Sequence, residues 1–167
     1  MLLDVNVVLD FVLDRPPFGE AASALWASAE RKEIEAVIPA HGVTTVFYLA
    51  ARQRDSAFAR RVVSDLLAVP DVAPVDGAVL RRALTLAWRD FEDAVCAAAA
   101  EGAGCDTLVT RDPKGYRGSS VVIMDPPTAV SLLRRGPGSD EVAERSGLPG
   151  RSDRRRRPRR PRRESRR

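Results

Sequence analysis

The stretch Leu2-Leu3-Asp4 decides the fold, because it places an acid directly after two apolar residues. An unbroken apolar run suits a strand that is covered on both faces, although so short a run does not by itself prove one. From Asn6 onward apolar residues recur at helical spacing, until Pro16 interrupts the pattern. A strand, an acid and a helix in direct succession predict the first unit of an α/β domain.

The same alternation of short apolar runs and helical patterns continues to about residue 135. Strands are predicted at residues 36–38, 72–75, 107–110 and 121–124, with Pro74 favouring an edge position for the second of these. Helices are predicted at about residues 18–32, 42–52, 55–68, 76–88, 91–102 and from Pro126 onward, with N-caps at Asp55, Asp76 and Asp125. Residues 111–119 are predicted to be a loop. The expected fold class is α/β, a three-layer α/β/α domain around a mostly parallel central sheet.

The net charge of +4 averages two very different regions. Residues 151–167 contain eleven arginines against one aspartate and one glutamate, so this segment carries +9 and residues 1–150 carry −5. We therefore predict a domain over residues 1–135 and a disordered Gly/Pro linker with an arginine-rich tail over 136–167. Such a tail suggests contact with nucleic acid, but it could equally be a solvated terminus without a role.

The composition excludes several classes of protein. Cys96 and Cys105 lie in unlike contexts and, with a single histidine, make neither a disulfide framework nor a zinc site. An acid at position 4 and Pro16-Pro17 break the apolar start, so we expect no signal peptide and no membrane span. The expected location is the cytoplasm.

Aspartates follow two of the predicted strands. Asp4 and Asp112 lie at or just past strand ends, where the sites of parallel sheets form. Asp93 lies near the start of an alanine-rich helix, and Asp90 precedes it by three residues. If that helix enters at the same sheet edge, Asp93 joins Asp4 and Asp112.

Carboxylates drawn together in this way favour a cation. Each like-charged pair at about 4 Å is unfavourable by roughly 4 kcal/mol at an effective dielectric constant of 20. Oxygen ligands without histidine or thiolate favour Mg²⁺ or Mn²⁺ over zinc. Such an ion can activate water against a phosphodiester.

Structural roles remain open for the same residues. Asp4 could cap the helix that begins near Asn6, and Asp112 could belong to the turn before Pro113. His41, the only histidine, could act as a general base, but a surface or loop position is the expectation.

Three segments of the chain resemble PIN domains. Each contains an acid in the expected context, and they occur in the family's order within residues 1–133, at residues 2–10, 90–94 and 104–112. The resemblance implies an Mg²⁺-dependent ribonuclease, most often the toxin of a VapC-type toxin–antitoxin pair. It further implies RNA as the substrate, a small antitoxin as a partner, and a homodimer.

The resemblance also implies roles for individual residues. The metal-site and catalytic acids would be Asp4, Asp93 and Asp112, with Asp90 assisting and with Asn6 and Thr110 orienting them. Arg111 is a candidate contact to nucleic acid, and so are Arg154, Arg155, Arg156 and Arg157 of the tail, which lies outside the resemblance.

One position departs from the family pattern. Many PIN domains carry a glutamate in the helix after the second strand, and Thr45 occupies that place here. A threonine hydroxyl supplies no charge, so a PIN-like module that binds RNA or protein without cleaving it is the alternative. A phosphatase of the haloacid-dehalogenase type would need an aspartate where Asn6 stands, and a receiver domain would need a strand-end lysine; both are disfavoured.

Overall fold

A computed structural model describes residues 1–135 of the chain, and the predictions made for the linker and tail lie outside these residues. Each of the first three strands is followed by two helices, as the sequence patterns predict. The strands are β1 (Leu2–Leu3), β2 (Val37–Pro39), β3 (Asp71–Ala73), β4 (Thr107–Val109) and β5 (Val122–Met124). The helices are α1 (Val5–Val12), α2 (Gly19–Glu30), α3 (Ala40–Gln53), α4 (Ser56–Leu66), α5 (Gly77–Leu86), α6 (Phe91–Gly102), the short 3₁₀ helix η1 (Pro113–Tyr116) and α7 (Pro126–Arg135).

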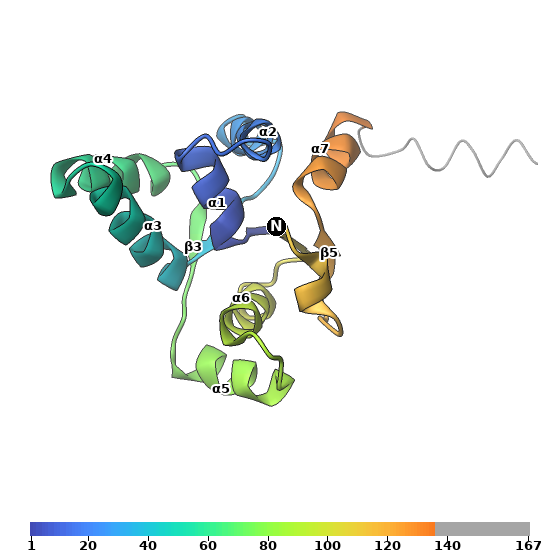
Figure 1. The fold of residues 1–167 in the computed structure, drawn as a ribbon. Coiled ribbons are helices and arrows are strands. Elements are labelled where there is room, and N and C mark those ends of the chain that lie inside the picture. Colours follow the sequence, from blue (N-terminus) through green and yellow to red (C-terminus); the bar gives the residue numbers. More distant parts are fainter. Residues whose placement is uncertain (136–167) are drawn as a thin grey trace, which may run out of the picture. The chain divides into compact units, whose positions relative to one another are not determined.

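All five strands form one parallel sheet in the order β3-β2-β1-β4-β5. In Figure 1, α1 and α2 lie on one side of this sheet, and α5 and α6 lie on the other. The α/β prediction with three layers is confirmed. The edge position expected from Pro74 is also confirmed, because β3 ends the sheet.

The sheet is buried between the helices that flank it. Leu2, Leu25 and Leu108 have no exposed surface, and Ala97 and Ala100 of α6 are equally buried. The alanine-rich sequence of α6 lets that helix approach the strands closely, since small side chains bring backbones together. The carboxyl ends of β1 and β4 are thereby held next to the first turn of α6.

Two predicted boundaries were wrong. The helix expected to reach Trp88 ends at Leu86, because Ala87 adopts a left-handed conformation with φ of 52°. The loop expected at residues 111–119 contains η1, whose first turn Asp112 caps by accepting a hydrogen bond from the Lys114 N–H. The caps expected at Asp55, Asp76 and Asp125 are all present. No helix of the described residues is long and apolar enough to cross a membrane.

Gly42 allows α3 to pack against the start of α1. A Cβ atom added there would lie 2.7 Å from Cγ2 of Val5. We therefore expect Gly42→Ala to lower the free energy of unfolding by about 1–3 kcal/mol through overpacking. Urea denaturation measures this change. Gly102→Ala is the control, because its added Cβ would meet nothing closer than 3.8 Å; equal stability of the two variants would contradict the prediction.

Candidate active site

The predicted acids line one pocket at the carboxyl edge of the sheet. Its volume is about 390 Å³, and its walls come from four separate segments of the chain. The lining residues are Asp4, Asn6, Phe18, Asp90, Asp93, Thr110, Arg111 and Asp112. Four of these residues are the aspartates that were predicted from the sequence to meet, and all four line this pocket.

The pairing of β1 with β4 places Asp4 beside Thr110. Leu3 is opposite Val109 in the parallel register, so the next residue of each strand emerges at the same edge. Thr110 Oγ1 donates a hydrogen bond of 2.8 Å to Asp4 Oδ2 and accepts one of 3.2 Å from the Asp112 N–H. The hydroxyl therefore connects the two strand-end aspartates.

Asp4 occupies the N-cap position of α1, but its side chain makes no capping hydrogen bond. Instead, the carboxylate is directed to Thr110 and to the Cys96 thiol, which donates to Oδ1 at 3.8 Å. Only 4% of the residue is exposed. Burial raises the pKa of Asp4, partly offset by the hydrogen bond from Thr110. The backbone N–H groups of Val5 and Asn6 also lower the pKa of Asp4, so the first turn of α1 favours its charged form.

The first turn of α6 holds the other pair of acids. Asp90 is the N-cap, with Oδ1 accepting hydrogen bonds from the N–H groups of Glu92 and Asp93 at 2.9 and 3.4 Å. This cap fixes the turn on which Asp93 faces the pocket. Burial, and then the charge of Asp90, raise the pKa of Asp93 to about 6, and the charges of Asp4 and Asp112 contribute further.

Gly115 in η1 lies directly over the acids. A Cβ built on it would be 2.6 Å from Oδ2 of Asp93 and 3.7 Å from Oδ2 of Asp112. Both carboxylates therefore lie within 4 Å of one point, which only a residue without a side chain leaves free. The next residue, Tyr116, is buried, and its hydroxyl has no hydrogen-bond partner among the described residues, although it lies near enough to Asp93 to favour the charged carboxylate.

The donor set fits a hard divalent cation. Carboxylate, amide and hydroxyl oxygens converge, and the pKa of Asp93 is raised by burial first and then by the neighbouring negative charges. Within residues 1–135, no three acidic, histidine or cysteine side chains stand close enough together to coordinate an ion directly. Binding would therefore require the acids to draw together, and the ion would relieve their mutual repulsion.

The raised pKa of Asp93 predicts pH-dependent metal affinity. Protons and a cation compete for the same carboxylate, so Mn²⁺ affinity should fall about tenfold per pH unit below about 6 and level off above it. In the metal-free protein, the contribution of Asp93 to the free energy of unfolding changes with pH in the opposite direction. The folded pKa lies above the ordinary 3.8, so this group's contribution to stability is full below about pH 4 and is lost as the pH rises through about 6.

Calorimetric titration with Mn²⁺ between pH 5 and pH 7 measures the first effect. The same titration of Asp93→Asn should show a much flatter profile. An affinity that is constant across this range in the unmodified protein would contradict the assignment of Asp93 to the metal.

Other predicted residues have different placements. Asn6 lines the pocket from the first turn of α1. Thr45 does not, because its hydroxyl donates to the His41 carbonyl one helical turn earlier, at 3.3 Å. His41 was expected in a loop or on the surface, and that expectation was wrong. It lies in the first turn of α3 with 25% of its side chain exposed, and its Nε2 is 3.8 Å from Glu92 Oε1 and 3.8 Å from Cys96 Sγ.

Asp10 is the site-related residue that the sequence argument missed. It is buried in α1, and its Oδ1 accepts a hydrogen bond of 3.1 Å from Nη1 of Arg111. The Arg111 guanidinium also lies over the ring of Phe18, 4.5 Å from its centroid. The available signal was an acid inside the apolar helix pattern, on the same helical face as Val7.

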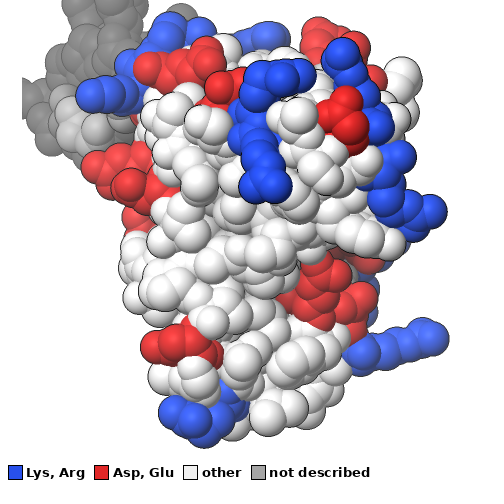
Figure 2. Space-filling model, turned by 90° about the vertical axis from the view of Figure 1, so that its left-hand side faces the viewer, with Lys and Arg blue, Asp and Glu red and all other residues white. Residues whose placement is uncertain are grey.

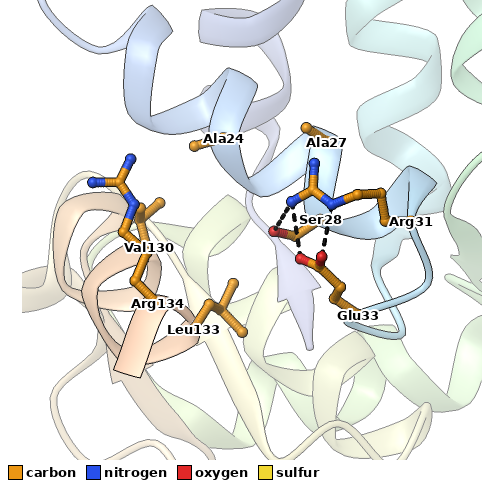
Figure 3. Close-up of a pocket in the computed structure, with 8 residues that line it drawn as sticks. All are labelled: Ala24, Ala27, Ser28, Arg31, Glu33, Val130, Leu133 and Arg134. Atoms are coloured by element: carbon orange, nitrogen blue, oxygen red, sulfur yellow. Dashed lines mark hydrogen bonds and ion pairs between the residues drawn. The ribbon is translucent and has the colours of Figure 1, made fainter. Parts of the chain in front are cut away.

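A separate hollow of about 450 Å³ lies between α2 and α7 (Figure 3). Its one acidic residue, Glu33, is paired with Arg31 at 2.7 Å, and Arg31 also donates to Ser28. Because its one carboxylate is already paired with an arginine, this hollow lacks the unneutralised carboxylates of the first pocket.

Comparison with known families shows to which family the chain belongs. A family model described as PIN domain matches residues 1–114, which is more than half of the chain. The chain belongs to the PIN domain family. None of the curated proteins matches the chain.

Solved structures with the PIN fold resemble this PIN domain at low sequence identity. A toxin–antitoxin complex from Klebsiella pneumoniae is 19% identical, with a TM-score of 0.57, over 75% of this chain and 96% of that one. VapBC-1 from nontypeable Haemophilus influenzae is 16% identical, with a TM-score of 0.58, over 75% and 97%. VapC20 from Mycobacterium tuberculosis, a toxin that cleaves the sarcin–ricin loop, is 16% identical, with a TM-score of 0.55, over 68% and 91%.

Proposed function

We propose that this PIN domain is an endoribonuclease that depends on Mg²⁺ or Mn²⁺ and serves as the toxin of a toxin–antitoxin pair. The observation that carries the proposal is the convergence of Asp4, Asp93 and Asp112 on one pocket. These side chains come from three distant parts of the chain and meet at the carboxyl edge of the sheet. The family and the toxin structures that share its fold support the choice of a nuclease.

The residues of the pocket are proposed to have different roles in binding the cation and the RNA. Asp4, Asp93 and Asp112 would hold the cation, which supplies charge neutralisation and an activated water when bound. Thr110 orients Asp4 by its 2.8 Å hydrogen bond, and Asp90 orients the turn that carries Asp93. Asn6 lines the pocket with an amide that can bind water or a ribose hydroxyl.

The proposal is tested by incubating the purified chain with total RNA in Mg²⁺, in Mn²⁺ and in EDTA. Discrete fragments that need the metal are the expected result. Intact RNA with either metal would favour a second candidate, a PIN module that binds RNA or protein without cleaving it. One observation favours that candidate: Thr45 brings neither charge nor hydroxyl to the pocket, so α3 contributes no acid.

The proposed partners are an antitoxin and a second copy of the chain. The structural neighbours include toxin–antitoxin complexes.

Figure 2 shows the side of the molecule that carries α3 and α4, where charged side chains gather toward the upper part and the middle is mostly uncharged. Large apolar side chains are exposed on this face, among them Tyr48 of α3 at 58% and Leu67, directly after α4, at 48%. Uncharged surface of this kind suits contact with protein. Action on cellular RNA would place the chain in the cytoplasm.

The tail arginines are proposed to bind the RNA backbone. Neutralising phosphates releases counterions, so affinity should fall steeply with salt. Replacing Arg154, Arg155, Arg156 and Arg157 with serine should reduce the slope of log affinity against log salt by up to about 3, at roughly 0.7 per lost phosphate contact. Fluorescence anisotropy over a salt series measures the slope, and identical slopes in the two proteins would argue against a role for the tail.

A further inference from the structure

Arg111 carries a positive charge beside several uncompensated carboxylates, yet it pairs with none of them. It lines the same pocket as Asp4, Asp93 and Asp112. Among residues 1–135, its only carboxylate partner within 4 Å is Asp10, at 3.1 Å. Coulomb attraction would otherwise draw a free guanidinium onto the acids, where it would occupy the place of a cation. Something must therefore hold it aside.

Asp10 and Phe18 hold the guanidinium from two directions. The Asp10 side chain is 1% exposed and sits in the middle of α1, so it cannot move toward the solvent. The ring of Phe18 lies under the guanidinium plane, 4.5 Å from its carbon. Stacking on an aromatic face and hydrogen bonding to a carboxylate together fix the orientation of an arginine more firmly than either contact alone.

The geometry leaves part of Arg111 free for a ligand. Nη1 donates to Asp10, whereas 31% of the side chain remains exposed at the pocket wall. The remaining N–H groups suit a phosphate oxygen, since guanidinium donors match phosphate geometry. A phosphodiester seated between this wall and a cation on the acids would meet positive charge on both sides.

We propose that Asp10 is a positioning residue that keeps Arg111 off the metal-site aspartates and presents it to the phosphodiester of single-stranded RNA. The inference rests on the proposed function for the identity of the substrate. The competition between Arg111 and a cation, however, can be measured without any RNA.

The first arm of the experiment measures Mn²⁺ affinity by calorimetry. Asp10→Asn keeps the size of the side chain but releases the guanidinium, so Mn²⁺ affinity should fall about tenfold. Arg111→Gln should bind Mn²⁺ at least as tightly as the unmodified protein. The double variant should recover that affinity, because no guanidinium remains to compete. An unchanged affinity in Asp10→Asn, or a double variant as weak as Asp10→Asn, would overturn the proposal.

The second arm measures binding of a short 2′-O-methyl single-stranded RNA in Mn²⁺. Arg111→Gln and Asp10→Asn should each weaken RNA binding about tenfold. Arg15→Gln is the matched control, because Arg15 also lies 4.0 Å from Asp10 but does not line the pocket. It should match the unmodified protein in both arms, and a loss of RNA affinity in Arg15→Gln equal to that in Arg111→Gln would overturn the assignment.

Phe18→Leu keeps the proposal testable if Asp10→Asn does not fold. Phe18 is 41% exposed, so its replacement leaves the core intact. Loss of the ring should weaken RNA binding about threefold, and unchanged RNA binding would count against the proposal. If the unmodified protein itself binds no RNA, the proposed function fails, while the Mn²⁺ arm still decides whether Asp10 restrains Arg111.

Discussion

Replacing Asp93 with asparagine is expected to lower the rate of metal-dependent RNA cleavage about a thousandfold. This factor corresponds to about 4 kcal/mol of transition-state stabilisation, in the range that a bound metal ion supplies. Asp93 is the acid whose pKa is raised most clearly by its surroundings, and asparagine keeps its size while removing the charge. The measurement is the initial cleavage rate of a labelled RNA at saturating Mg²⁺.

Asp106→Asn is the matched control, because Asp106 is exposed in a turn and lies outside the pocket. It should cleave at the unmodified rate. Thermal unfolding should show that both variants are folded. Equal rates for Asp93→Asn and Asp106→Asn would remove Asp93 from the catalytic residues.

Mn²⁺ is expected to stabilise the fold strongly, and this effect should vanish in Asp4→Asn. A ligand at a hundred times its Kd raises the free energy of unfolding by about 2.7 kcal/mol. The ion would neutralise Asp4, Asp93 and Asp112, whose repulsion the metal-free fold must tolerate. Urea denaturation at several Mn²⁺ concentrations measures the increase.

Removal of a carboxylate should also change the metal-free protein. Asp93→Asn relieves repulsion above about pH 6, so without metal it should be more stable than the unmodified chain at pH 8. The two stability curves should therefore cross as Mn²⁺ is added. A parallel response of both proteins to Mn²⁺ would place the ion elsewhere.

The strand-end acids could be predicted from sequence because parallel topology fixes them. Once Leu2-Leu3 and residues 107–110 are strands of one parallel sheet, Asp4 and Asp112 must emerge at the same edge. Asp93 could be placed there only if its helix enters at the same edge, which the resemblance to PIN domains implied. The inference for Asp4 and Asp112 needed only the pattern of apolar residues and the connectivity of the strands.

Contacts across the pocket could not be predicted in the same way. Asp10 looks like an acid misplaced in an apolar helix until Arg111, one hundred and one residues later, is seen beside it. The position of His41 near Asp4 and Glu92 depends on how α3 meets α6, which no local pattern encodes. The resemblance showed that Thr45 stands where many PIN domains have a glutamate. Only the structure shows that Glu92 of α6 places a negative charge near His41 of α3.

The proposed function depends on one cation held jointly by Asp4, Asp93 and Asp112. Anomalous diffraction from crystals grown with Mn²⁺ tests this most directly. The expected result is an anomalous peak within about 2.5 Å of oxygens from all three side chains, close to the roughly 2.0–2.1 Å typical of small divalent ions. A peak bound by other residues, or ordered carboxylates that remain apart with no peak between them, would contradict it.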